Sequence, residues 1–253
     1  MCKKMLVILI LLCILSTSAL GEQMKEEYAP TTDKEILFLN ITWNETAENA
    51  SRFIQETFPA INSIETDENR HYGFSDPTRK ISEYVEADQA QITSLNFERI
   101  TDDRYGLSSP LGIVAGYGIV NLSMCFLHND DFGLFEARYY LGIDNNNEIY
   151  IDLKHKLSDL YGIPYEYEIE ATGFTGKELH KNAVWIGANS TAVYLEYTRY
   201  YTGYLAGSES ISLCYGTTAA NAIIERLAAE EAKLEEQLEE QRKEELQNNH
   251  TGL

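Results

Sequence analysis

The hydrophobic pattern is most regular between residues 145 and 164, where apolar side chains recur with the period of an α-helix. The stripe consists of Ile149, Leu153, Leu157 and Leu160, widened by Tyr150 and Tyr161. Asn145 is a suitable N-cap, and Gly162 can adopt the left-handed conformation that ends a helix. Asp152 and Lys156 are spaced to form an ion pair on the polar face. The pattern therefore predicts a helix with one solvated face and one face that packs on a sheet.

Apolar runs and alternating patterns predict strands on both sides of this helix. The strands are expected near residues 36–41, 92–100, 111–127, 134–142, 183–188, 191–201 and 209–216. In the third of them, the inward positions would be Val120, Leu122, Met124 and Phe126. The run at 36–41 is continuously apolar, which suits a strand that is buried on both faces.

A second helix is expected before Pro59, with Asn44 or Thr46 as its N-cap. Its inward residues would be Ala47, Ala50, Phe53, Ile54 and Phe58. Apart from the strand near 92–100, the region 60–110 shows no clear pattern, and the stretch 166–182 is polar. We therefore expect no regular structure in that polar stretch.

Strands alternating with two helices predict an α+β domain over residues 35–216, built from antiparallel sheets with packed helices. The order of the elements also suggests a tandem duplication, with repeats at 35–142 and 143–216. In this hypothesis Phe126 and Tyr215, which both end strands that carry a cysteine, occupy equivalent positions.

The last segment, 217–249, has no glycine or proline and is rich in strong helix formers. The apolar residues of its first turns, which could dock on the domain, are Ile223, Ile224 and Leu227. Those beyond are Leu234, Leu238 and Leu246. Glu231 and Glu245 interrupt the heptad seam. We interpret the segment as a long charged helix, solvated alone or in a weak coiled coil. The alternative is a dedicated partner-binding or dimerising helix, through which the chain would form oligomers.

Residues 1–21 have the pattern of an export signal, with a basic start, an apolar run at 6–15 and small residues before a cleavage site at Gly21. The run is short for a membrane span, and an uncleaved anchor is the alternative. After cleavage, the polar leader 22–34 would be flexible. The pattern predicts a secreted or extracytoplasmic protein that has no membrane span after signal cleavage.

The formal net charge of −20 at pH 7 becomes more negative when the signal and its two lysines are removed. Such a charge repels polyanions, so we exclude nucleic acid and anionic membrane surfaces as partners. Of the four cysteines, only Cys125 and Cys214 lie beyond the signal, and the chain is therefore no disulfide scaffold. Both fall in predicted strands on the more polar face. A single disulfide between them is an alternative to two packed thiols.

Four short segments resemble blocks of uncharacterised secreted proteins from gut Firmicutes. They are FLNITWNET at 38–46, VAGY at 114–117, DLKHKLSDLYG at 152–162 and WIGANST at 185–191. Asn40 and Asn44 stand where the first block of those proteins carries glycines. More loosely, the order of elements is similar to the α+β repeats of beta-lactamase-inhibitor proteins and of small outer-membrane assembly lipoproteins. The family resemblance implies no activity and therefore no catalytic residue.

The known motifs for catalysis, cofactors and metals do not fit this sequence. Three glycines at 112–118 precede no helix that could receive a pyrophosphate, so we interpret them as strand bends. The stretch ATGFTGKE at 171–178 lacks the first glycine of a phosphate loop. The run DNNNE at 144–148 resembles half of a calcium loop, but Ile149 stands at the glycine position. The five histidines have no paired ligand spacing. We assign no catalytic, cofactor-binding or metal-binding residue.

Tyrosine is the main aromatic residue, with 17 in the chain, and several tyrosines gather on one predicted strand and the turn after it. The candidate binding surface consists of Tyr194, Tyr197, Tyr200, Tyr201 and Tyr204. Because side chains alternate along a strand, some of these rings face solvent if the others face the core. Such rings could stack on a sugar or a peptide. The alternative is that tyrosine simply suits a half-buried strand.

Two functional hypotheses remain. The first is a non-enzymatic binding or interaction protein whose partner is a protein or a glycan of the cell envelope. The second is an extracellular hydrolase of glycans or peptides, whose carboxylates converge only in three dimensions. A deep pocket with two carboxylates of shifted pKa would favour the hydrolase, and a flat face would favour the binding protein.

Overall fold

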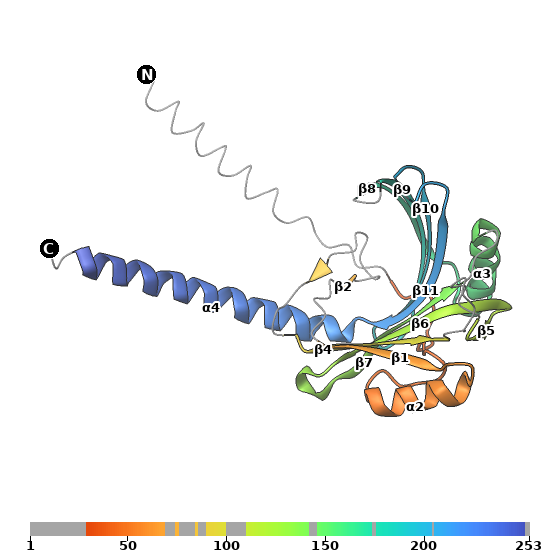
Figure 1. The fold of residues 1–253 in the computed structure, drawn as a ribbon, viewed down its shortest axis with the longest axis horizontal. Coiled ribbons are helices and arrows are strands. Elements are labelled where there is room, and N and C mark those ends of the chain that lie inside the picture. Colours follow the sequence, from red (N-terminus) through yellow and green to blue (C-terminus); the bar gives the residue numbers. More distant parts are fainter. Residues whose placement is uncertain are drawn as a thin grey trace, which may run out of the picture.

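The structure is a computed structural model that describes residues 29–68, 74–75, 84–85, 90–99, 110–141, 146–173, 176–203 and 205–250. A nine-stranded antiparallel sheet dominates it, in the order β1-β4-β6-β7-β11-β10-β9-β8, with β5 paired to β6 (Figure 1). The strands are β1 (Ser63–Glu68), β4 (Ile92–Glu98), β5 (Gly112–Val114), β6 (Tyr117–Leu127), β7 (Gly133–Leu141), β8 (Tyr165–Gly173), β9 (Gly176–Ile186), β10 (Thr191–Tyr200) and β11 (Glu209–Thr217). A separate pair consists of β2 (Phe74–Ser75) and β3 (Tyr84–Val85). The helices are α2 (Ala47–Thr57), α3 (Asn146–Tyr161), α4 (Ala219–His250) and the short 3-10 helix η1 (Asn129–Asp131).

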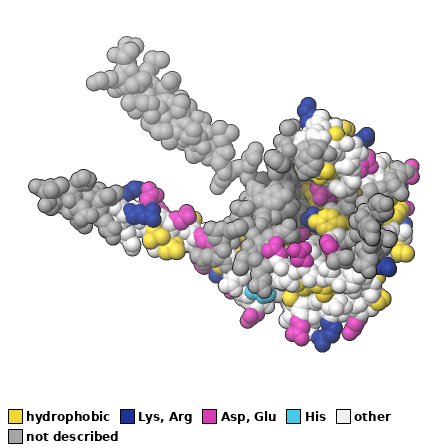
Figure 2. All heavy atoms as spheres, viewed as in Figure 1, with side chains coloured by type: hydrophobic (Ala, Val, Ile, Leu, Met, Phe, Trp, Pro, Cys, Tyr) yellow, Lys and Arg dark blue, Asp and Glu magenta, His cyan; other side chains and the backbone are white. Residues whose placement is uncertain are grey.

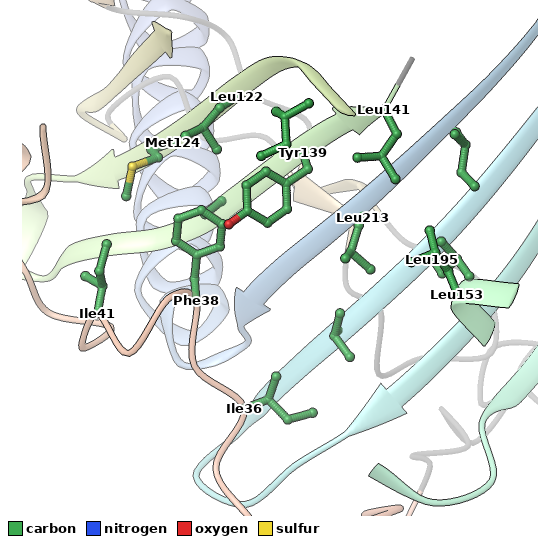
Figure 3. Close-up of a cluster of buried hydrophobic side chains, with 14 of the residues drawn as sticks. Ile36, Phe38, Ile41, Leu122, Met124, Tyr139, Leu141, Leu153, Leu195 and Leu213 are labelled. Carbon is green, nitrogen blue, oxygen red and sulfur yellow. The ribbon is translucent and has the colours of Figure 1, made fainter. Parts of the chain in front are cut away.

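The main hydrophobic core lies between one face of this sheet and α2, α3 and the segment before α2. Figure 3 shows how side chains from separate parts of the chain meet there. Those labelled are Ile36, Phe38, Ile41, Leu122, Met124, Tyr139, Leu141, Leu153, Leu195 and Leu213. The predicted α+β class, with an antiparallel sheet, packed helices and a C-terminal helix, is confirmed.

The helix predicted from the clearest pattern is α3. Its buried residues include Ile149, Tyr150, Leu153 and Leu157. Leu160, which was expected in the stripe, is 57% exposed, whereas Tyr161, the next residue, packs against the main core. Gly162 has a φ of +86°, and its N–H donates to the carbonyl of Ser158 at 2.9 Å, as expected for a helix end. Asp152 and Lys156 form the predicted ion pair at 2.6 Å. The expected cap Asn145 lies outside the described residues.

The helix α2 agrees with its predicted N-cap, since the side chain of Thr46 accepts a hydrogen bond from the N–H of Asn49. Ala50 and Ile54 are buried as expected. Phe53 was predicted to face inward, but it is 41% exposed. It precedes Ile54 by one residue, and a rotation of about 100° per residue carries its side chain away from the stripe that the sheet covers.

The N-terminal segment differs from its prediction. Ile36, Phe38 and Ile41 are buried, but the segment 36–41 forms a tight turn rather than a strand, because the N–H of Ile41 donates to the carbonyl of Phe38 at 2.8 Å. Leu39 and Asn40 have φ values of +51° and +63°, which a strand does not allow. The leader predicted to be flexible, 22–34, is anchored to the sheet before its predicted end. Thr31 donates from its main-chain N–H and its hydroxyl to the carbonyl of Ile186, at 2.8 and 3.1 Å.

The polar stretch 166–182, where no regular structure was expected, forms the hairpin of β8 and β9. The sequence of β8 alternates tyrosine with glutamate, so both faces of the strand looked polar. A bulge in β6 between Ile119 and Asn121 changes another prediction. Ile119 rather than Val120 therefore joins Leu122, Met124 and Phe126 in the core.

The helix α4 docks only through its first turns, where Ala220 and Ile224 pack with Phe135 and Leu127 in a second, smaller cluster. Arg226 also bonds Asp130 of η1 at 2.7 Å. Further along, Leu234 and Leu238 are about half exposed, at 50% and 46%. Figure 1 shows the rest of the helix projecting away from the sheet. Among the described residues, no helix is long and apolar enough to cross a membrane.

The chain contains two successive units in which a helix is followed by four strands of the sheet's continuous order, and the first unit also contains the short strand β5, which pairs with β6. The first unit is α2 with β1, β4, β6 and β7, and the second is α3 with β8, β9, β10 and β11. The units meet where β7 pairs with β11. Phe126 lies on β6 of the first unit and Tyr215 on β11 of the second, and their equivalence stays a prediction.

Candidate functional site

The tyrosines predicted as a binding surface lie on both faces of β10. Val193, Leu195 and Tyr197 point into the main core, and Tyr197 is only 2% exposed. Alternation therefore sends Tyr194 to the opposite face, where its hydroxyl lies 3.0 Å from that of Tyr167. Tyr197 faces the main core and not the opposite face of the sheet, so its place in the predicted surface is a correction.

The remaining tyrosines lie at the end of β10. Tyr200 is partly buried, and Tyr201 is 49% exposed with the guanidinium of Arg199 at 5.4 Å from its ring centroid. Tyr204 lies outside the described residues. The four described tyrosines do not share one surface, because Tyr197 faces the core and Tyr201 lies beyond the strand.

The face of the sheet opposite the main core carries a line of polar and aromatic residues. Strand register places one residue from each of five neighbouring strands side by side. They are Tyr140, Ser212, Glu196, Asn182 and Tyr167, from β7, β11, β10, β9 and β8, and we call them the polar row. Because neighbouring strands lie about 4.8 Å apart, the row extends over about 19 Å.

Arg138 lies beside the polar row on β7, between two glutamates. Its guanidinium lies 3.5 Å from Glu136 and 3.9 Å from Glu196, distances longer than those of a strong charge-assisted hydrogen bond. Its Nε is buried and has no hydrogen-bond partner in the described part of the chain. The guanidinium also lies 6.0 Å from the ring centroid of Tyr140. Arg138 is thus largely removed from water without full compensation.

Asn182 adds a second uncompensated group. Its side chain is 2% exposed, and its Oδ1 has no hydrogen-bond partner among the described residues. Register places it between Glu196 and Tyr167. The polar face therefore holds one buried donor, Arg138 Nε, and one buried acceptor, Asn182 Oδ1, that are both unpaired. Buried polar atoms are usually paired, so such groups call for a physical explanation.

His180 lies next to the row on β9 and shares one nitrogen between two neighbours. Its Nδ1 is 3.0 Å from Thr198 Oγ1 and 3.2 Å from Glu196 Oε1. The hydrogen bond with Glu196 raises the pKa of His180 above its ordinary value, against the opposing effect of burial. Burial raises the pKa of Glu196, but His180 and the charge of Arg138 outweigh it, so the net pKa is lowered. Glu196 is therefore an ionised carboxylate at neutral pH.

The two cysteines lie on this polar face, as predicted, but they do not form a disulfide. Strand β7 lies between β6, which carries Cys125, and β11, which carries Cys214. Burial raises the pKa of the Cys214 thiol, which keeps it protonated and a poor nucleophile.

Figure 1 shows the sheet bent, with α2 and α3 on its outer side. In the same view, Figure 2 shows a hollow beside β10 and β11 in which hydrophobic, acidic and basic side chains lie together. Side-chain exposures of 23% for Arg138 and 24% for Glu196 agree with a recessed surface that solvent still reaches.

Two cavities lie elsewhere on the described part of the chain. One, of about 420 Å3, runs between α3 and the β8–β9 hairpin, and its lining includes Tyr167 and Asn182 of the polar row. Its charged residues pair with one another. Lys154 bonds Glu166 at 2.8 Å, and Lys181 lies 3.8 Å from Glu168. The other, of about 330 Å3, lies beside the start of α2. The described residues contain no group of three or more His, Cys, Asp or Glu that could hold a metal ion.

The sequence reasoning missed Arg138, Glu196, Asn182 and His180. A signal was present at the first two, because each is a charged residue within a strand that is largely apolar or aromatic. Asn182 and His180 fell in the stretch where no strand was expected. Comparison of the chain with protein-family models, with curated protein sequences and with solved structures found no match.

Proposed function

We propose that this protein is a non-enzymatic, extracytoplasmic binding protein whose ligand lies on the polar row. The observation that carries the proposal is the pair of buried, unpaired polar atoms, Arg138 Nε and Asn182 Oδ1, on one recessed face. Burying polar atoms without partners lowers the stability of the free protein. A ligand that accepts a hydrogen bond from the first and donates one to the second would recover that free energy.

The charge of the site limits which ligands can bind, because it determines the sign of charge that is tolerated. Glu136 and Glu196 flank Arg138, and Glu178 lies 3.7 Å from His180, so acidic groups outnumber Arg138 around the row. With a chain charge of −20, this arrangement disfavours anionic ligands. The ligand is therefore neutral or cationic, and a protein or glycan of the cell envelope remains the proposed partner.

A hydrolase is the alternative, and one observation makes it the weaker candidate. A general acid needs a raised carboxyl pKa, whereas Glu196 has a lowered one.

Export belongs to the same proposal, and its support is the pattern of residues 1–21, which lie outside the described part. N-terminal sequencing of the exported protein should give a chain that begins at Glu22. A chain that retains residues 1–21 would support the uncleaved anchor instead.

We also propose that the two units of the sheet arose by duplication, as their common order of a helix and four strands suggests. The likeness to the repeats named above rests on the same order. Oligomerisation through residues 217–249 remains a proposal as well, and its support is the exposure of Leu234 and Leu238.

The binding proposal is tested with the double variant Arg138→Met, Glu196→Gln. The variant removes the charge pair of Arg138 with Glu196 and also the contact of Arg138 with Glu136, so its melting curve is measured first to show that it folds. Stabilisation of the wild-type protein by neutral, cationic and anionic compounds is then measured by thermal shift.

We expect a neutral or cationic compound to raise the Tm of the wild-type protein and not that of the folded variant. Equal stabilisation of both proteins would overturn the proposed site. Cleavage of the compound would support the hydrolase.

A further inference from the structure

We propose that the ligand of the polar row is a neutral oligosaccharide that lies across the strands. This inference rests on the proposed function and names the class of ligand. It starts from the chemistry of the row, which combines two tyrosine rings with an ionised carboxylate, an amide and a hydroxyl group.

The unpaired atoms of the site can be satisfied only by a ligand that both donates and accepts hydrogen bonds. Arg138 Nε donates and Asn182 Oδ1 accepts, and both are buried without a partner in the described part of the chain. The carboxylate of Glu196 accepts, and its contact with the hydroxyl of Ser212 is long at 3.5 Å. A sugar hydroxyl group is both donor and acceptor, so adjacent hydroxyls on one saccharide can satisfy all three kinds of group.

The tyrosines stand at the two ends of the row. Tyr140 is 39% exposed on β7, and Tyr167 is partly buried on β8, four strands away. An aromatic ring offers a flat apolar surface to the C–H face of a sugar ring, and polar groups between two such rings fix its orientation. The length of about 19 Å suits a short oligosaccharide better than a single sugar.

The main chain of the sheet argues against an extended peptide. Strands β7, β11, β10 and β9 each pair with a neighbour on both sides, so their N–H and C=O groups are already used, and of the five strands of the row only β8 lies at an edge of the sheet. A peptide that binds as an added strand would pair along such an edge and would not cross the row. A ligand that crosses the four inner strands therefore contacts side chains there, which is the way a saccharide is held.

The test uses two probes, cellotetraose and tetra-N-acetylchitotetraose, with a neutral alanine tetrapeptide and a lysine tetrapeptide as the competing class. Binding to the full mature chain is measured by NMR titration. Tyr140→Ala removes a ring of the row, and Tyr201→Ala removes a ring of similar exposure outside it. Asn182→Ala, checked by its melting curve, removes the buried acceptor.

We expect at least one tetrasaccharide to bind saturably. Tyr140→Ala should raise its Kd about tenfold or more, and Tyr201→Ala should change it by less than about twofold. Asn182→Ala should also raise the Kd, because the saccharide then loses its acceptor.

The saccharide inference is overturned if neither tetrasaccharide binds, or if Tyr140→Ala and Tyr201→Ala weaken binding equally. Binding of a tetrapeptide that is lost in Tyr140→Ala would overturn the saccharide and leave the proposed function standing. If the Arg138→Met, Glu196→Gln variant binds every compound as the wild type does, the proposed site itself fails.

Discussion

Replacing Gly162 by alanine tests whether the packing of the N-terminal segment against the end of α3 stabilises the fold. Gly162 has a φ of +86°, and a Cβ at this position would lie 2.6 Å from the carbonyl oxygen of Thr31. Gly207 is a matched control, because its φ is +85° but a Cβ there meets nothing within 4 Å. Both substitutions impose the same backbone strain, and only the first displaces a neighbour.

The backbone strain costs about 1–2 kcal/mol for alanine in the left-handed region. At Gly162 the clash also moves Thr31, which exchanges hydrogen bonds of 2.8 to 3.1 Å with Ile186. Net losses of about 0.5–1.5 kcal/mol for each hydrogen bond bring the total for Gly162→Ala to roughly 3–4 kcal/mol. Valine, which is β-branched, should cost more still.

Urea denaturation of the two variants measures the difference. We expect Gly207→Ala to lower the free energy of unfolding by about 1–2 kcal/mol, and Gly162→Ala by roughly 2 kcal/mol more. Equal losses in the two variants would mean that Thr31 does not restrain the helix end, and the docking of residues 31–34 on β9 would then be wrong.

Three further predictions concern the tail, the histidine and the core tyrosine. Deletion of residues 233–253 should lower the Tm by less than about 3 °C, because Leu234 and Leu238 are half exposed; aggregation of the truncated domain would show that the tail is packed. The folded state raises the pKa of His180, so its stabilising effect is complete below about pH 6.5 and is lost as the pH rises through the raised pKa. His180→Gln should therefore lose more stability, relative to wild type, at pH 5.5 than at pH 8.5 in urea denaturation, and a pH-independent difference would refute this. Tyr197→Ala should lower the free energy of unfolding by roughly 3–5 kcal/mol, against less than about 0.5 kcal/mol for Tyr201→Ala; similar losses would place Tyr197 outside the core.

Local signals account for what could be predicted of the fold. The end of α3 follows from Gly162, and the N-terminus of α2 from Thr46, because each depends on a few neighbouring residues. The hairpin β8–β9 was missed because β8 alternates tyrosine with glutamate, and only its pairing with β9 makes it a strand. The prediction of a strand at 36–41 was wrong for a related reason. Hydrophobicity predicted its burial, but the turn at Leu39 and Asn40 decides its shape.

The candidate site depends on register between strands that are distant in sequence. Arg138 and Glu196 could be noticed as charged residues in largely apolar strands, but nothing local indicates that they meet. Their proximity follows from the pairing of β7 with β11 and of β11 with β10. The tyrosines were noticed for the right reason, alternation along β10. The same alternation puts Tyr197 on the side of Val193 and Leu195, and this side faces the core.

The most direct test of the binding proposal is the NMR signal of the Arg138 Nε–H group, assigned by comparison with Arg138→Met. In the free protein this N–H has no hydrogen-bond partner in the described part of the chain. On saturation with a tetrasaccharide that binds, we predict a downfield proton shift and slower exchange with water, because the group gains an acceptor. A signal that stays unchanged while the ligand binds would contradict a ligand site on the polar row.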